Sequence, residues 1–93
     1  MSQLLTEAGI EQQVKVLSGW TVKNSKLHIT RTFKDFIEAI EFVNKLVEPA
    51  ESAGHHPDIE ISYNKVKITL TSHDAGGLTQ ADFDVAQAIS QIQ

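Results

Sequence analysis

Two stretches of the chain alternate apolar and polar residues with the period of a β-strand. In residues 58–71 the apolar positions are Ile59, Ile61 and Tyr63, followed by Val66, Ile68 and Leu70. We expect a hairpin with Asn64-Lys65 as its two-residue turn, because Asn tolerates the positive φ of hairpin turns. This pairing places Tyr63 opposite Val66, Ile61 opposite Ile68 and Ile59 opposite Leu70, all on one face.

The earlier alternating stretch covers residues 20–33. Trp20-Thr21-Val22 predicts a short strand, Asn24-Ser25 predicts a turn, and apolar Leu27, Ile29 and Phe33 alternate with polar residues in a second strand. Arg31 interrupts the apolar face, so we expect this second strand to lie near an edge of the sheet.

A longer apolar stripe with helical spacing occupies the middle of the chain. Its members are Phe36, Ala39, Ile40, Val43, Leu46, Val47 and Ala50. The pair Thr32 and Asp35 suggests a start related to a capping box, and Gly54 suggests a left-handed end. Pro49 lacks the N–H that would bond to the carbonyl of Lys45, so a kink or a break with a restarted last turn is expected there.

Shorter helices are predicted at both ends. Thr6 can cap the first, whose apolar positions are Ile10, Val14 and Leu17. Thr79 and Asp82 form a capping-box pair at the start of the last. The buried face of this last helix is expected to carry Ala81, Val85, Ala88, Ile89 and Ile92.

The resulting order is α-β-β-α-β-β-α. Both strand pairs have one apolar face, which predicts an α+β fold with a four-stranded antiparallel sheet and three helices packed on one face. The other face should be polar and open. A chain of 93 residues without repeats or linkers is expected to form a single domain, residues 1–93.

Composition narrows the possible functions. There is no cysteine, which excludes disulfides, a thiolate nucleophile and a zinc–cysteine site. The formal net charge is -4 and the eight Lys and Arg residues are scattered, so direct nucleic-acid binding is not expected. No apolar run reaches the roughly 20 residues that span a membrane, and residues 1–7 lack a secretory signal. We expect a cytoplasmic protein.

Three of the four histidines belong to one spaced series that also contains two carboxylates. The series is Glu51-x3-His55-His56-Pro57-x5-Tyr63-x9-His73-x8-Asp82. Histidine gives and takes a proton near neutrality, because its ordinary pKa is about 6.5. Such a set suits proton transfer without a nucleophile or a cofactor.

This spacing resembles the signature of the pterin-4a-carbinolamine dehydratases from Glu51 to Asp82, and more loosely elsewhere. The resemblance implies a hydro-lyase that eliminates water from a 4a-hydroxytetrahydropterin to give the quinonoid dihydropterin, which is recycled after aromatic amino acid hydroxylation. It implies a pterin substrate, a functional link to a hydroxylase, and neither a metal nor a cofactor. The same α+β fold is implied.

The resemblance also implies roles for individual residues. His55 and His73 would transfer protons, and His56 would chiefly bind and orient the substrate. Glu51 precedes His55 by one helical turn, so it could orient that imidazole, and Asp82 would join Glu51 in substrate binding. The chain departs from some family members at Gly54, where they carry an acid, and at Ile59, where they carry an aromatic residue.

Plainer interpretations exist for single residues in the series. A lone His-His pair could cap a helix end, Glu51 could be a solvated surface carboxylate, and Asp82 could be only a capping residue. Tyr63 is expected to be structural. Outside the series, we expect His28 to be exposed and Trp20 to anchor the core.

Two other functions compete with the dehydratase. Three histidines and a carboxylate could ligate zinc or iron, although the adjacent His55 and His56 would point in opposite directions on an extended segment. A non-catalytic binding module is the second, because some relatives are dimerisation partners of transcription regulators or assembly factors. Family members form dimers through sheet edges and tetramers through helices, so we expect a homodimer or homotetramer.

Overall fold

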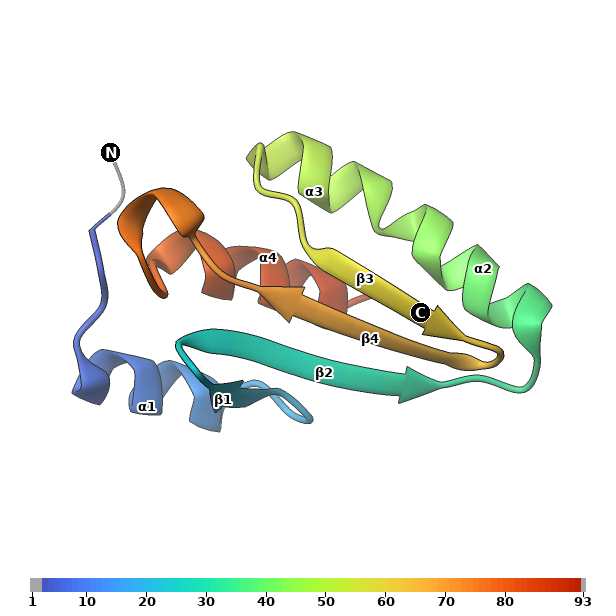
Figure 1. Ribbon diagram of the computed structural model, residues 1–93, viewed down its shortest axis with the longest axis horizontal. Helices are drawn as coiled ribbons and strands as arrows, with labels where there is room; N and C mark the ends of the chain where they lie inside the picture. Colours follow the sequence, from blue (N-terminus) through green and yellow to red (C-terminus); the bar gives the residue numbers. More distant parts are fainter. Residues whose placement is uncertain (1–2, 93) are drawn as a thin grey trace.

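The computed structural model describes residues 3–92; Met1, Ser2 and Gln93 of the predicted domain lie outside the described residues. The elements are α1 (Glu7–Lys15), β1 (Thr21–Lys23), β2 (Lys26–Thr32), α2 (Phe36–Lys45), α3 (Val47–Ala53), β3 (Asp58–Ser62), β4 (Lys65–Leu70), the 3₁₀ turn η1 (His73–Ala75) and α4 (Gln80–Ser90) (Figure 1). The predicted order is confirmed, with the middle helix divided into α2 and α3.

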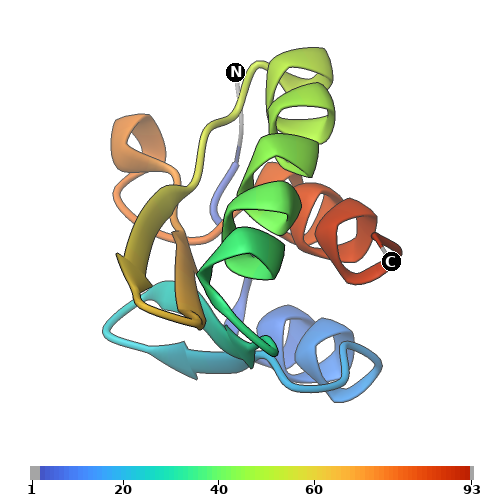
Figure 2. The same ribbon diagram turned by 90° about the vertical axis from the view of Figure 1, so that its right-hand side faces the viewer.

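The sheet and the helices form two layers. The strands are antiparallel in the order β1-β2-β4-β3, and Figure 2 shows the helices on one face of this sheet. No helix among residues 3–92 has both the length and the apolar character needed to cross a membrane.

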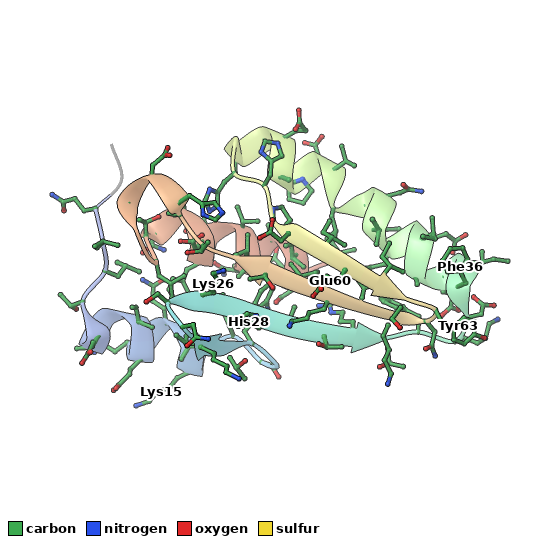
Figure 3. All side chains as sticks on the ribbon, viewed as in Figure 1. Lys15, Lys26, His28, Phe36, Glu60 and Tyr63 are labelled. Carbon is green, nitrogen blue, oxygen red and sulfur yellow. The ribbon has the colours of Figure 1, made fainter. Side chains whose placement is uncertain are left out.

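Strand periodicity determines which side chains enter the core. In β2 and β4 the buried positions alternate with partly or fully exposed ones, and Leu27 lies opposite Leu70 while Ile29 lies opposite Ile68. Each of these side chains contributes about 1.5–3 kcal/mol when buried. The opposite face is polar, as predicted, and Figure 3 shows Lys26, His28 and Glu60 on the strands of this open face.

The first helix and the first turn form as predicted. The Thr6 side chain accepts a hydrogen bond from the backbone N–H of Gly9 at 3.0 Å and caps α1. Asn24 and Ser25 both adopt positive φ, as a tight hairpin turn requires. Trp20 is buried in the core, and its Nε1–H donates to Ser90 Oγ at 2.7 Å. The prediction of a core anchor is therefore confirmed.

The start of α2 differs from the prediction. Asp35 itself is the N-cap, and its Oδ1 accepts from the N–H of Glu38 at 2.9 Å. Glu38 completes the cap by accepting from the N–H of Lys34 at 3.1 Å. Thr32 is still the last residue of β2. The capping pair is therefore Asp35–Glu38, three residues further along the chain than expected.

The break predicted at Pro49 is present. The helix is interrupted at Leu46, and α3 restarts so that Pro49 lies in its first turn, where a missing N–H costs no helical hydrogen bond. Gly54 ends α3 in the left-handed conformation with φ 59°. The N–H of His55 then donates to the carbonyl of Ala50 at 3.1 Å. This capping pattern turns the chain sharply at the residue before the histidine pair.

The expectation that β2 lies near an edge is confirmed, because only the three-residue strand β1 lies outside it. β1 pairs with Lys26–His28, and β4 pairs with the strand from Leu27 to Thr32. The Arg31 side chain is accommodated because its guanidinium lies 5.0 Å from the Phe42 ring centroid and donates to the carbonyl of Ile92 at 3.4 Å. The three-residue length of β1 leaves the end of β2 open on that side.

The β3–β4 hairpin turns one residue earlier than predicted. Ser62 pairs with Lys65, so Tyr63 and Asn64 form the turn and Ile59 lies opposite Ile68. The predicted register was wrong by two positions, a shift that keeps every side chain on its predicted face. Tyr63 takes the positive φ of 53°. Asn64 is instead bound to the segment before α2, where it donates through Nδ2 to the Phe33 carbonyl at 2.8 Å.

Candidate active site

The three predicted histidines come together where α3 ends, β3 begins and β4 leads into η1. A pocket of about 540 Å³ opens there. Its lining contains all three histidines of the spaced series, His55, His56 and His73. The other lining residues are Ala53, Gly54, Thr71, Ser72, Asp74, Ala75 and Ala81. The hairpin therefore brings histidines that are distant in the sequence to one cavity.

His55 is held by a buried carboxylate. Its Nε2 lies 2.5 Å from Oδ1 of Asp82, whose side chain is 0% exposed, while the His55 side chain is 18% exposed. A carboxylate only accepts hydrogen bonds, so Nε2 carries the proton. No protein atom among residues 3–92 bonds to Nδ1 of His55. Nδ1 is therefore the ring nitrogen left to meet a ligand.

The second oxygen of Asp82 belongs to the start of α4. Oδ2 accepts from the N–H of Thr79 at 2.9 Å and from Oγ of Ser72 at 2.8 Å. The capping box predicted for Thr79 and Asp82 is present. One oxygen of Asp82 therefore caps the helix, as the plainer interpretation expected, and the other faces His55. The side chain is 0% exposed and does not line the pocket, so Asp82 contacts His55 and is not placed for the direct substrate binding that was expected of it.

Glu51 does not reach the histidine that the helical spacing suggested. Its Oε2 lies 2.5 Å from Nε2 of His56, not His55, and both side chains are well exposed, at 66% and 61%. The reason is the left-handed Gly54, which ends the helix before His55 and breaks the four-residue spacing. The expected contact between Glu51 and His55 is corrected to a surface pair between Glu51 and His56.

His73 lies on η1 and lines the same pocket as the histidine pair. Its side chain is exposed, and no hydrogen bond from it is formed within the described residues. Gly76 follows in the left-handed conformation with φ 78° and ends the turn. Both ring nitrogens of His73 are therefore open to a ligand.

The histidine pair is divided between two carboxylates. Because His55 bonds to Asp82 and His56 bonds to Glu51, the two rings face separate partners, as expected for adjacent residues on an extended segment. Within residues 3–92, no group of three or more His, Asp or Glu side chains is arranged to hold a metal ion. The described geometry matches paired acid–base groups more closely than a ligand cage.

Sequence reasoning missed Ser72. It follows the buried positions Val66, Ile68 and Leu70 at the same two-residue spacing and is 7% exposed. A polar residue at an inward-facing position requires a hydrogen-bond partner. That requirement was the available clue, and the partner is Asp82.

A second cavity, of about 480 Å³, lies between α1 and α4 and is lined in part by Gln13, Arg31 and Gln87. Its described lining contains no histidine and no carboxylate. It lacks the groups for proton transfer near neutrality, so the histidine pocket is the stronger candidate for catalysis.

The chain is similar to known proteins over its whole described length. The family model described as "Pterin 4 alpha carbinolamine dehydratase" matches residues 3–92. A protein of Nostoc punctiforme named "Putative pterin-4-alpha-carbinolamine dehydratase" is 85% identical over 93 residues, which is 100% of both chains.

Two solved structures share the fold. The crystal structure of a transcriptional coactivator/pterin dehydratase from Brucella melitensis has a TM-score of 0.87 and 31% identity, covering 91% of this chain and 93% of that one. A pterin dehydratase-like protein identified as a RuBisCO assembly factor in the alpha-carboxysome has a TM-score of 0.61 and 24% identity, covering 76% and 82%. At that identity the second match shows the fold alone.

Proposed function

This chain belongs to the pterin 4 alpha carbinolamine dehydratase family, and we propose that it eliminates water from a 4a-hydroxytetrahydropterin to give the quinonoid dihydropterin. The observation that carries the proposal is the His55–Asp82 pair. Oδ1 of the buried Asp82 carboxylate accepts a hydrogen bond from Nε2 of His55 at 2.5 Å. Nδ1 of His55 is then left for a ligand in the pocket that His73 also lines. Two imidazoles on one cavity provide the acid and the base that a dehydration needs.

The reaction requires two proton transfers and no change of oxidation state. Hydroxide is a poor leaving group, so one imidazole delivers a proton to the departing oxygen as the C4a–O bond breaks. The lone pair of a ring nitrogen forms the new C=N bond, and the other imidazole accepts a ring proton. His55 and His73 are the residues proposed for these transfers. Positioned acid–base groups supply about 10²–10⁴-fold, or roughly 3–5 kcal/mol of the barrier.

His56 and Glu51 are proposed to bind and orient the pterin. Their mutual hydrogen bond lies on the exposed surface, and His56 also lines the histidine pocket. A solvent-exposed pair of this kind contributes little to the free energy of folding. Its proposed role is to hold the His56 imidazole in one orientation for the substrate. Asp82 would act on the substrate indirectly, through His55.

The proposed context is recycling of the tetrahydropterin used by an aromatic amino acid hydroxylase in the cytoplasm. The chain would act as a homodimer or homotetramer. Direct nucleic-acid binding is not part of the proposal, because the net charge is -4 and such binding needs a concentrated basic surface.

Stopped-flow measurement of 4a-carbinolamine dehydration by the purified protein tests the proposal. We expect a rate well above the uncatalysed reaction, unchanged by a chelator. Loss of activity on chelation with recovery on addition of zinc would overturn the histidine acid–base mechanism.

A non-catalytic binding module remains the alternative function. It is favoured by the coactivator name of the Brucella melitensis neighbour and by exposed apolar side chains on α2 and α3, namely Phe36, Ile37 and Val47. A folded, purified protein that does not accelerate the dehydration would favour this alternative over the enzyme.

A further inference from the structure

The side chain of Ser72, at the end of β4, forms hydrogen bonds to two residues at the start of α4, Thr79 and Asp82. Its hydroxyl donates to Oδ2 of Asp82 at 2.8 Å, and because it has a single proton, the contact with Thr79 Oγ1 at 2.8 Å must be donated by Thr79. Thr79 closes the ring, because its own N–H donates to the same Oδ2 of Asp82 at 2.9 Å. All three residues are buried. The result is a closed ring of hydrogen bonds with every proton assigned.

This ring restricts the carboxylate that holds His55. Two donors, Ser72 Oγ and the N–H of Thr79, bind Oδ2 of Asp82, while Oδ1 faces His55. Rotation of the carboxylate would break both contacts to Oδ2. Each hydrogen bond to an ionised group is stronger than a neutral one, so the direction of Oδ1 depends on the donors at Oδ2.

The backbone of Ser72 builds the turn that carries His73. Its carbonyl accepts from the N–H of Ala75 at 3.1 Å and of Gly76 at 3.0 Å, and its own N–H donates to the carbonyl of Gly77 at 3.0 Å. The residue next to His73 is thus hydrogen-bonded on both sides of its backbone. Ser72 therefore supports both proposed proton-transfer residues. It contacts the carboxylate that bonds to His55, and its backbone forms the turn that carries His73.

We infer that Ser72 is a positioning residue that sets the orientation of His55 through Asp82, while its backbone fixes the turn bearing His73. The inference rests on the proposed function for its catalytic consequence. Helix capping alone would need only Thr79 and Asp82. The additional donor from the end of β4 is what links the pocket wall to the carboxylate.

The test compares three variants. Ser72→Ala removes the hydroxyl and leaves the backbone contacts; Ser72→Thr keeps the hydroxyl; Ser52→Ala is the matched control, because Ser52 Oγ also donates to a carboxylate, Glu48, at 2.7 Å, but on the exposed surface. We expect Ser72→Ala to lower kcat about ten- to a hundredfold, the equivalent of a lost hydrogen bond to a charged group. Ser72→Thr and Ser52→Ala should stay within about threefold of wild type.

A readout independent of turnover is the Nε2 proton of His55 in ¹H–¹⁵N spectra. The bond to Asp82 should give a downfield resonance that shifts or broadens in Ser72→Ala and not in Ser52→Ala. Unchanged kcat together with an unchanged resonance in Ser72→Ala would overturn the inference. If the wild type proved inactive while the resonance still responded, the proposed function would fall and the positioning role would stand.

Should Ser72→Ala fail to fold, Ser72→Cys replaces it. The thiol is a weak donor of similar size, so the same loss of kcat and the same change of the His55 resonance are expected. Wild-type values for both in a folded Ser72→Cys would count against the inference.

Discussion

Asp82 Oδ1 lies 2.5 Å from His55 Nε2 across 27 positions of sequence, and the other oxygen of the same carboxylate caps α4. One buried side chain therefore supports a helix start and an imidazole at once. The stability of α4 and the orientation of His55 are coupled through this residue, because Asp82 contacts both.

Replacement of Asp82 by Asn should reveal this coupling. The Asp82 carboxylate accepts from His55, Ser72 and the N–H of Thr79, whereas an amide has a single acceptor oxygen. We expect Asp82→Asn to lower the free energy of unfolding by about 1–3 kcal/mol and kcat by about tenfold or more. Urea titration and stopped-flow rates measure the two effects. Asp84→Asn, which changes an exposed carboxylate on the same helix, should leave both near wild type.

Removal of either proposed proton-transfer group should slow the dehydration step. His55→Ala and His73→Ala are each expected to reduce kcat by about 10²–10⁴-fold, measured by stopped flow at saturating substrate. His28→Ala is the control, because His28 lies on the open face of the sheet with Thr69 and the Lys23 carbonyl as partners. Rates near wild type in both of the first two variants would show that the roles are wrongly assigned.

The pair formed by Glu51 and His56 should influence binding more than turnover. We expect His56→Ala and Glu51→Gln to raise KM several-fold with a smaller change in kcat. Both side chains are mostly exposed, so the free energy of unfolding should change by less than about 0.5 kcal/mol. A large fall in kcat with KM unchanged would instead place His56 in the proton transfer.

The left-handed Gly54 should be sensitive to any Cβ atom for conformational reasons. A Cβ built there meets no atom within 4 Å, so the cost comes from φ 59° alone. We expect Gly54→Ala to lower the free energy of unfolding by about 1–2 kcal/mol and Gly54→Asn by less, since Asn tolerates this region. Thermal unfolding of both variants provides the comparison. Equal stability of Gly54→Ala and wild type would argue against this turn before His55.

Self-association is expected from two exposed apolar surfaces. Ile37 is 68% exposed and Val47 is 60% exposed on α2 and α3, while β3 carries Ile61 at 41% and pairs on one side only within the described sheet. Light scattering at micromolar concentration should return the mass of a dimer or tetramer. Ile37→Lys should lower that mass if the helices form the contact. A wild-type mass near 10.3 kDa would contradict the prediction.

Periodicity was sufficient to predict the layers and faces of the fold. The alternation through Val66, Ile68 and Leu70 determines which side is buried, and that pattern does not depend on the exact turn. The hairpin register was predicted incorrectly because Asn64 bonds to Phe33, 31 positions away. This contact is tertiary, so the local preference of Asn for positive φ could not predict it.

In the pocket, too, local sequence spacing did not predict the contacts that depend on the tertiary structure. The three spaced histidines line one cavity, but helical spacing assigned Glu51 to His55. The actual partner is His56, because the geometry of the residues after Gly54 is no longer that of a helix. Ser72 could have been noticed as a polar residue in a buried position, although its partner Asp82 emerges only when β4 and α4 are packed together.

The Tyr63–Asn64 turn lies at the end of the β3–β4 hairpin away from the histidine pocket (Figures 1 and 3). Tyr63 is 66% exposed, and the pocket-lining residues belong to the segments at the opposite end of these strands. A fluorophore or a surface-immobilisation handle placed at this turn would thus leave the cavity open. The hairpin therefore separates the histidine pocket at one end from a site for attachment at the other.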